Sequence, residues 1–172
     1  ATRRFKDLYL SGRAYINDGI KLDAGDGIYF GQDGTAANKL DDYEEGTFSP
    51  AYSLTNATIT HDLQNGSYTK IGNLVTFQIL LGTDAATGTF TGSNVLIVGL
   101  PFTCSDNLSG AVGLNYAFAS ELDSPAWFIG AGTTVITIYK NDNLASNVKG
   151  NQFGTGVNDN RMYITGSYRT SS

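Results

Sequence analysis

Alternation of apolar and polar residues is the pattern that most constrains this chain. Every second residue is apolar in 75–81, 112–118 and 135–139, and no stretch carries the spacing of a helix. Because successive side chains of a strand point to opposite faces, each run predicts a strand with one buried face. We expect a core that includes Phe77, Ile79, Ile97, Leu114, Ile136 and Ile164.

Turn residues separate these runs. Clusters of Asn, Asp, Gln and Gly occur at 64–66, 82–84, 105–107, 141–143 and 158–160. Strands at this spacing, without helices between them, are typical of an antiparallel sandwich. The sequence therefore predicts an all-β fold in which residues 51–172 form a jelly-roll-like β-sandwich head.

Residues 5–34 show a different organisation, with apolar pieces of about three residues between Gly, Asn and Asp clusters. Strands this short do not bury an apolar face within one chain, whereas three copies wound around a common axis bury it against each other. We therefore predict a short, intertwined, homotrimeric β stalk. Its expected core consists of Tyr9, Ile16, Ile20, Leu22, Ile28 and Phe30.

An acidic segment, residues 40–50, lies between the two patterns and gives three predicted parts: a stalk in 1–38, a junction in 39–50 and a head in 51–172. Its carboxylates are Asp41, Asp42, Glu44 and Glu45. Glycoside cleavage needs an acid and a base about 5–9.5 Å apart across a sugar. Residues this close in sequence do not reach around a ring, so we predict that they pair with Arg or Lys of a neighbouring chain or stay solvated.

Composition excludes several functions. The net charge is −5 and no basic cluster exceeds Arg3-Arg4, which argues against nucleic acid and against an anionic membrane surface. No apolar run approaches the length of a bilayer span, so membrane insertion is not expected. Charged residues make up 16% of the chain, against about a quarter in an ordinary soluble monomer, and burial of surface in an oligomer explains a low value.

Catalytic residues, metals and cofactors are not expected. Zinc sites need several His or Cys ligands, whereas His61 and Cys104 are the only residues of their kinds. Asp-Gly loops at 23–27 and 32–34 offer calcium ligands but match no calcium-binding repeat. We expect His61 at a turn or strand edge, and Cys104 as a small buried residue without a disulfide partner.

Four strings of the sequence carry a resemblance to one protein family: RFKDLYLSG at 4–12, GTAANKLDDYEEGTFSP at 34–50, GSYTKIGNLV at 66–75 and ITGSYRT at 164–170. They resemble, in this order, a stalk repeat, the link from stalk to head, the strand pair that follows it, and the chain end in tail-fibre and tailspike proteins of tailed bacteriophages. The resemblance extends from about Phe5 to the C-terminus. Because the chain does not begin with Met, we expect it to be a piece of a longer fibre protein.

This resemblance implies a homotrimer at the tip of a virion fibre, made in the host cytoplasm, joined to the remainder of the tail fibre and responsible for host attachment without catalysis. The expected receptor is a cell-surface polysaccharide or lipopolysaccharide, with an outer-membrane protein as the alternative. Two other functions stay open: a depolymerase that cleaves surface polysaccharide, and a structural trimerisation cap without a ligand.

Head loops carry the candidate binding residues. Loops at 83–92, 122–127 and 141–160 combine short polar side chains with occasional aromatics, which suits hydrogen bonding and stacking of a neutral glycan. The candidates are Trp127, Phe153, Phe90 and Asn143. Trp127 and Phe128 are adjacent, so one of them faces the core of a strand pair; the sequence leaves open which one.

Overall fold

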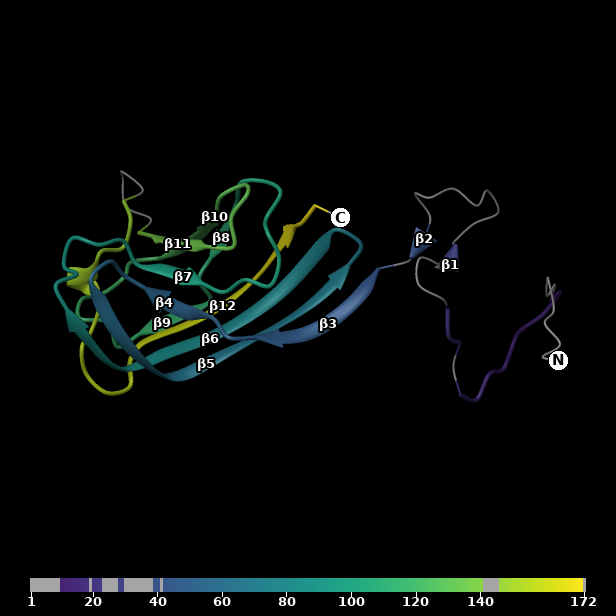
Figure 1. Cartoon of the computed structure of the whole chain (residues 1–172), viewed down its shortest axis with the longest axis horizontal. Coiled ribbons are helices and arrows are strands. Elements are labelled where there is room, and N and C mark those ends of the chain that lie inside the picture. Colours follow the sequence, from purple (N-terminus) through teal and green to yellow (C-terminus); the bar gives the residue numbers. More distant parts are fainter. Residues whose placement is uncertain are drawn as a thin grey trace. The chain divides into compact units, whose positions relative to one another are not determined.

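The computed structural model describes residues 10–18, 20–22, 28–29, 39–40, 42–140 and 146–171. Within this part of the chain the regular elements are strands and one 3-10 turn, η2 (Gly150–Gln152), without an α-helix. The chain divides into two compact units, Ala1–Asp41 and Asp42–Ser172, whose elements are labelled in Figure 1. The all-β prediction is therefore confirmed.

The first unit contains two short described strands, β1 (Ile28–Tyr29) and β2 (Lys39–Leu40), which pair antiparallel. The predicted stalk-core side chains on described residues are all exposed in the single chain: Ile16 at 52%, Ile20 at 68%, Leu22 at 42% and Ile28 at 48%. Tyr9 and Phe30 lie outside the described residues. One chain thus leaves this apolar surface uncovered, which is the premise of the trimer prediction, and the trimer itself stays a prediction.

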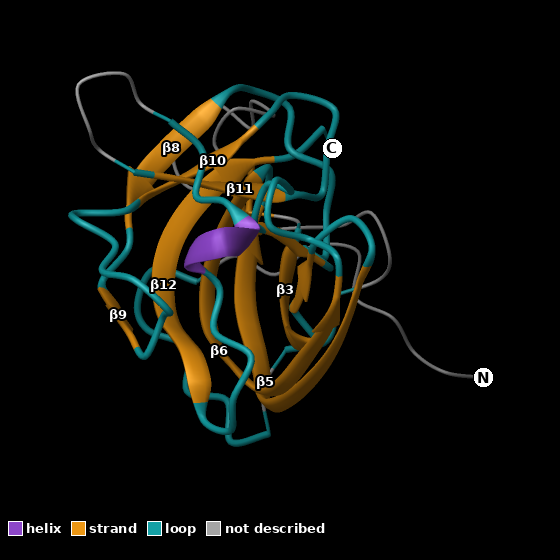
Figure 2. Cartoon of the chain, turned by 90° about the vertical axis from the view of Figure 1, so that its left-hand side faces the viewer, coloured by secondary structure: helices purple, strands orange, loops and turns teal. Residues whose placement is uncertain are grey.

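The second unit is a sandwich of two antiparallel sheets with five strands each, stacked one above the other in Figure 1 and seen from the end in Figure 2. The long sheet has the order β3-β5-β6-β12-β9, and the short sheet has the order β4-β7-β11-β10-β8. The long sheet consists of β3 (Tyr43–Phe48), β5 (Ala57–Ile71), β6 (Leu74–Gly88), β12 (Asp159–Arg169) and β9 (Leu114–Tyr116). The short sheet consists of β4 (Ala51–Ser53), β7 (Leu96–Val98), β11 (Ile136–Tyr139), β10 (Ala126–Ile129) and β8 (Leu108–Ala111).

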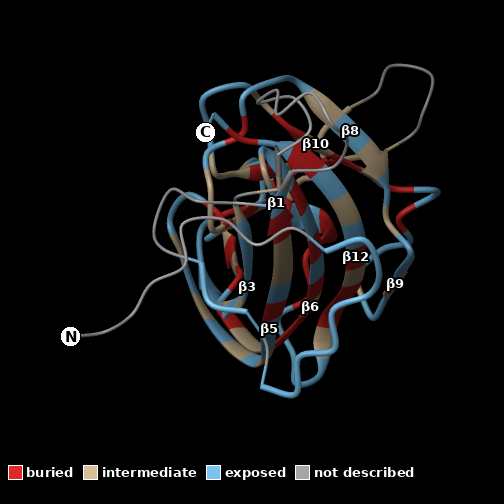
Figure 3. Cartoon of the chain, turned by 90° about the vertical axis from the view of Figure 1, so that its right-hand side faces the viewer, coloured by how far each residue is buried: buried red, intermediate tan, exposed pale blue. Residues whose placement is uncertain are grey.

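The core lies between the two sheets, where Figure 3 shows the buried residues. In β6 the predicted alternation is confirmed, since every second residue from 75 to 81 is at most 2% exposed. Facing this row are the buried side chains Ile97, Trp127, Ile129, Ile136 and Ile138 of the short sheet. Full burial of one such side chain stabilises a fold by about 1.5–3 kcal/mol, so these rows hold the sheets together.

Leu114 is not in the core, so this prediction is wrong. It lies in the edge strand β9 and is 51% exposed, and Tyr116 is 48% exposed. In the register, Leu114 lies opposite Tyr163, which itself lies between the buried Met162 and Ile164 of β12. Residues directly opposite each other share a face of the sheet, so Leu114 and Tyr116 point to solvent. Alternation identifies two faces of a strand but does not say which one is buried.

β5 and β6 form one hairpin of two 15-residue strands. The turns predicted at 64–66 and 82–84 are wrong, because both segments lie inside these strands. The chain reverses instead at Gly72-Asn73, where Gly72 has a φ of +57°. A positive φ at the first residue of a two-residue loop, without a positive φ at the second, is the type II′ geometry, which matches the twist of the flanking strands.

Four glycines inside the strands mark aromatic contacts rather than turns. Gly66 lies opposite Phe48, and a Cβ at Gly66 would lie 2.7 Å from that ring. The same arrangement recurs in three further cross-strand pairs, Gly46–Tyr68, Gly110–Trp127 and Gly166–Phe77. In each pair the ring covers the backbone of the glycine opposite, which compensates for the missing side chain.

Candidate functional site

The three aromatic residues predicted to bind a ligand are core residues. Trp127 is 4% exposed, Phe90 6% and Phe153 3%. Of the two assignments left open in β10, Trp127 faces inward and Phe128 outward. The prediction that these rings offer stacking faces is therefore wrong, because they are covered by the core. Asn143 lies outside the described residues.

From Asp42 onward, the acidic segment is part of the second unit. The second unit begins at Asp42, and β3 pairs with β5 along its whole length. Asp42 forms an ion pair with Lys70 of β5. The Lys70 ammonium is buried and lies 5.7 Å from the centre of the Phe102 ring. The cationic partner of Asp42 is thus a lysine of the same chain, whereas the prediction was a partner in a neighbouring chain or a solvated carboxylate.

The two glutamates of β3 also have partners, and Asp41 lies outside the described residues. The Tyr68 hydroxyl donates a hydrogen bond to Glu44, and the Tyr43 hydroxyl donates one of 2.8 Å to Glu45. These hydrogen bonds raise the pKa of both tyrosines. The Glu44 contact ties β3 to β5, and the Glu45 contact lies within β3, so both carboxylates serve the structure of this edge.

His61 and Cys104 also have structural contacts. His61 Nε2 accepts a hydrogen bond of 2.9 Å from the backbone N–H of Tyr52, and the two rings are stacked with centres 6.0 Å apart. Burial lowers the pKa of His61, and the Asp62 carboxylate offsets part of this effect. Cys104 is buried, and its thiol donates to the carbonyl of Asp106. Among the described residues no group of three or more His, Cys, Asp or Glu is placed to hold a metal ion.

A hollow of about 470 Å³ lies beside the edge strand β9. Its lining combines an exposed tyrosine with amide, hydroxyl and carboxylate side chains. We call it the Tyr116 hollow, and its residues are Asn115, Tyr116, Ala117, Phe118, Ser120, Glu121, Leu122, Asp123 and Ser124. Leu122, Asp123 and Ser124 of this lining lie in the predicted head loop 122–127. This loop therefore contributes polar side chains to a surface hollow.

The loop that forms the Tyr116 hollow is anchored to the core. Phe118 packs edge-on against Phe153 with ring centres 6.2 Å apart, and Leu122 is 6% exposed. Near the two ends of the loop, Ala117 and Ser124 have left-handed φ values of 58° and 43°. Non-glycine residues keep such angles where the surrounding structure over-determines them. The polar side chains between these anchors are therefore presented on a fixed backbone.

Tyr116 supplies the aromatic surface of this hollow. Its ring stacks on Tyr163 of β12, with centres 6.4 Å apart and planes inclined by 15°. Interaction with the Tyr116 hydroxyl raises the pKa of Tyr163. An aromatic ring accepts the C–H face of a sugar, and nearby carboxylates, amides and hydroxyls bond its hydroxyl groups. The hollow is therefore suited to one sugar ring.

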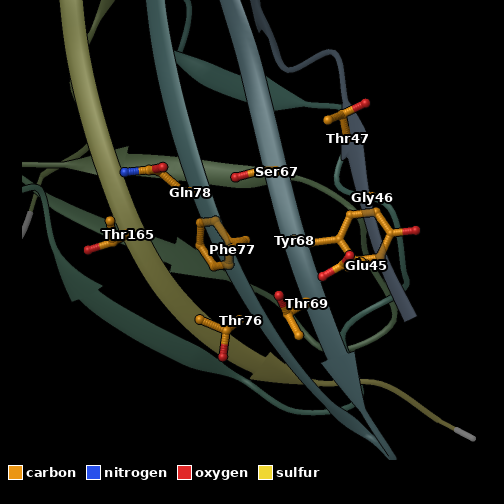
Figure 4. A pocket seen from close by; sticks show the side chains of 10 residues that line it. All are labelled: Glu45, Gly46, Thr47, Ser67, Tyr68, Thr69, Thr76, Phe77, Gln78 and Thr165. Carbon is orange, nitrogen blue, oxygen red and sulfur yellow. The ribbon is translucent and has the colours of Figure 1, made fainter. Parts of the chain in front are cut away.

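A second recess lies on the solvent face of the long sheet. Two adjoining depressions of about 590 Å³ and 410 Å³ share Thr47, Ser67 and Gln78. The larger one is also lined by the side chains of Glu45, Thr69, Thr76 and Thr165. Figure 4 shows these side chains standing on neighbouring strands of the sheet. We call this recess the hydroxyl groove, after the residue type that dominates it.

The sequence alone does not identify either recess. The alternation in 112–118 predicts Tyr116 on the inward row, and only the pairing with β12 places it outside. For the hydroxyl groove the sequence holds a signal: the alternate positions 67, 69, 165 and 167 carry Ser and Thr, where a solvent face usually carries Lys and Glu. Its meaning depends on which strands are neighbours, which the sequence does not state.

Comparison of the chain with family models, with curated proteins and with solved structures finds no match. The resemblance to phage fibre proteins therefore stays a prediction from the sequence strings. Within the described part of the chain, no helix has the length and apolar character needed to cross a membrane.

Proposed function

We propose that this chain is the end region of a homotrimeric phage tail fibre or tailspike, which attaches the virion to its host by binding a surface glycan without cleaving it. The strings at 4–12, 34–50, 66–75 and 164–170 support the fibre assignment through their resemblance. The glycan assignment is supported by the Tyr116 hollow. The proposed receptor is a polysaccharide or lipopolysaccharide.

The observation that carries the proposal is the exposed Tyr116 ring, held by Tyr163 beside a polar loop. Tyr116 is 48% exposed beside the open hollow, so part of its ring remains accessible to a ligand. A sugar ring uses both parts of this arrangement, since its C–H face covers the aromatic ring while its hydroxyls bond Glu121, Asp123 and Asn115. The anchored loop keeps the entropic cost of binding low.

A trimer increases the effect of one weak site. Three copies on a rigid fibre raise the effective concentration of the second and third contacts, so overall binding exceeds that of one site by a large factor. The exposed apolar residues of the first unit, including Ile16, Ile20 and Ile28, support assembly at that end of the chain. The proposal includes no catalysis, and the carboxylates Asp42, Glu44 and Glu45 have partners within the sheet.

An array of bacterial surface polysaccharides tests this function. The wild-type chain should bind a subset of them, and Tyr116→Ala should weaken that binding by about 2- to 10-fold per site, the value of one aromatic contact. Tyr15→Ala is the control, since Tyr15 is a tyrosine with 84% exposure that lines neither the hollow nor the hydroxyl groove. Release of reducing sugar would assign a depolymerase instead, and binding to no polysaccharide would assign a structural cap.

A further inference from the structure

We infer that the hydroxyl groove is a second glycan-binding surface, which holds an extended segment of a neutral polysaccharide. This inference rests on the proposed function, because it takes the receptor to be a glycan. It adds the class of ligand: an internal stretch of a polysaccharide, bound in addition to the sugar ring in the Tyr116 hollow.

The register of the long sheet gathers the groove from four strands. Residues directly opposite one another share a face, and one outward row runs across β3, β5, β6 and β12. This row consists of Thr47, Ser67, Gln78 and Thr165. The next outward row on the same face consists of Glu45, Thr69, Thr76 and Ser167. Two parallel rows of short polar side chains thus lie side by side.

The dimensions favour a chain over a single ring. Four neighbouring strands span about 14 Å, since adjacent strands are about 4.8 Å apart. The two depressions of about 590 Å³ and 410 Å³ continue each other through Thr47, Ser67 and Gln78. One sugar ring fills neither the length nor the combined volume. A linear oligosaccharide segment matches an elongated recess of this kind.

The chemistry of the lining selects an uncharged polar ligand. Hydroxyls both donate and accept hydrogen bonds, and the Gln78 amide does the same, as a polyol requires. Lys and Arg are absent from the residues that line either depression, so phosphate or carboxylate groups find no counter-charge. Glu45 is the acidic residue of the lining, and it already accepts a hydrogen bond from Tyr43. A basic peptide is a poorer match for the groove than a neutral glycan, because it would need several carboxylates in the lining.

Apolar side chains lie on both sides of the groove, with the polar Gln64 and Asn65 beside one of them. Beyond the Glu45 row, the next outward row of the sheet contains the exposed Tyr43, Ile71 and Leu74. On the other side, Leu80 lines the smaller depression. Sugar rings present C–H faces as well as hydroxyls, so apolar margins around a polar floor match an extended glycan. A second copy of this chain is the competing occupant of such a surface, and the experiment includes it as an outcome.

The test uses Ser67→Trp, which fills the centre of the groove, and the milder pair Thr69→Val with Thr76→Val, which removes hydroxyls without changing volume. Thr58→Trp is the control, because Thr58 is an exposed residue of β5 that lines neither depression. The probes are lipid-free bacterial O-polysaccharides, neutral and phosphate-bearing, together with mono- or disaccharide fragments of each neutral polysaccharide that binds.

Ser67→Trp should lower affinity for the neutral polysaccharide by about tenfold or more, because it excludes the chain from several hydrogen bonds. The Val pair should give a smaller loss, Thr58→Trp none, and binding of the short fragments should depend on Tyr116 alone. Unchanged polysaccharide binding in Ser67→Trp, with loss in Tyr116→Ala, would overturn this inference and leave the proposed function intact. A change of molecular mass by light scattering in Ser67→Trp would assign the groove to contacts between copies and overturn it as well. No polysaccharide binding by the wild-type chain would overturn both proposals.

Discussion

Replacing Gly110 with Ala should destabilise the sandwich through Trp127. Gly110 of β8 lies opposite Trp127 of β10, and a Cβ at position 110 would lie 2.4 Å from Trp127 Cζ2. The ring is also packed closely on its other side, against Gly166 of the other sheet. A Cβ built on Gly166 would lie 2.4 Å from the same ring atom. Trp127 therefore fills the space between two glycines, one in each sheet.

The magnitude follows from two opposing effects. Overpacking a core costs about 1–3 kcal/mol, whereas Ala in place of Gly contributes about 0.4–1 kcal/mol of stability by restricting the unfolded chain. We expect a net loss of about 1–2 kcal/mol in the free energy of unfolding, which lowers the melting temperature by about 2–8 °C for a domain of this size.

Thermal unfolding followed by circular dichroism measures this loss. Gly92→Ala is the matched control, because nothing lies within 4 Å of a Cβ at that position. In a Trp127→Leu background, Gly110→Ala should cost much less, since the ring that it meets is gone. Equal melting temperatures for Gly110→Ala and Gly92→Ala would refute the reasoning, and so would a full cost in the Trp127→Leu background.

Three further predictions concern stability and assembly. Burial holds the pKa of His61 below its usual 6.5, so the unfolded chain takes up a proton first as pH falls. The free energy of unfolding should therefore decrease below pH 6.5, and His61→Gln should remove this part of the pH dependence. Identical pH profiles for the two proteins would contradict this prediction. Asp42→Asn should lower the free energy of unfolding by about 1–3 kcal/mol in urea titrations, because the buried Lys70 ammonium loses its counter-charge. Adding Lys70→Met to Asp42→Asn should restore most of the lost stability. No restoration in the double variant would count against the ion pair as the cause. A chain that begins at Asp42 should keep its strand signal while its mass by light scattering falls from three chains to one, and an unfolded product would show that the second unit does not fold on its own.

The sequence predicts the parts of this fold that depend on one strand at a time. The buried rows of 75–81 and 136–138 follow from period-two alternation alone. Leu114 shows where this reasoning ends, since its side of the sheet depends on the partner strand β12. Turn prediction fails at Gly66 for a related reason: the glycine is required by the Phe48 ring across the strand pair, and that contact appears in no local pattern.

The same limit applies to the candidate sites. The sequence makes Trp127 and Phe153 candidate binding residues, because aromatics in polar surroundings suit sugar binding. Both rings pack in the core instead. Tyr116 has the exposure that such a residue needs, but its position follows from the register with Arg161–Tyr163. The hydroxyl groove likewise exists because strands far apart in sequence, β3 and β12, are brought into one sheet.

Binding of the fluorescently labelled chain to whole cells tests the central claim most directly. The comparison uses bacteria that display a surface polysaccharide recognised on the array and isogenic cells that lack it. The account predicts that the wild-type chain labels the first cells and not the second, and that Tyr116→Ala loses most of this labelling while Tyr15→Ala keeps it. Equal labelling of both kinds of cell would contradict the account and would point to a protein receptor.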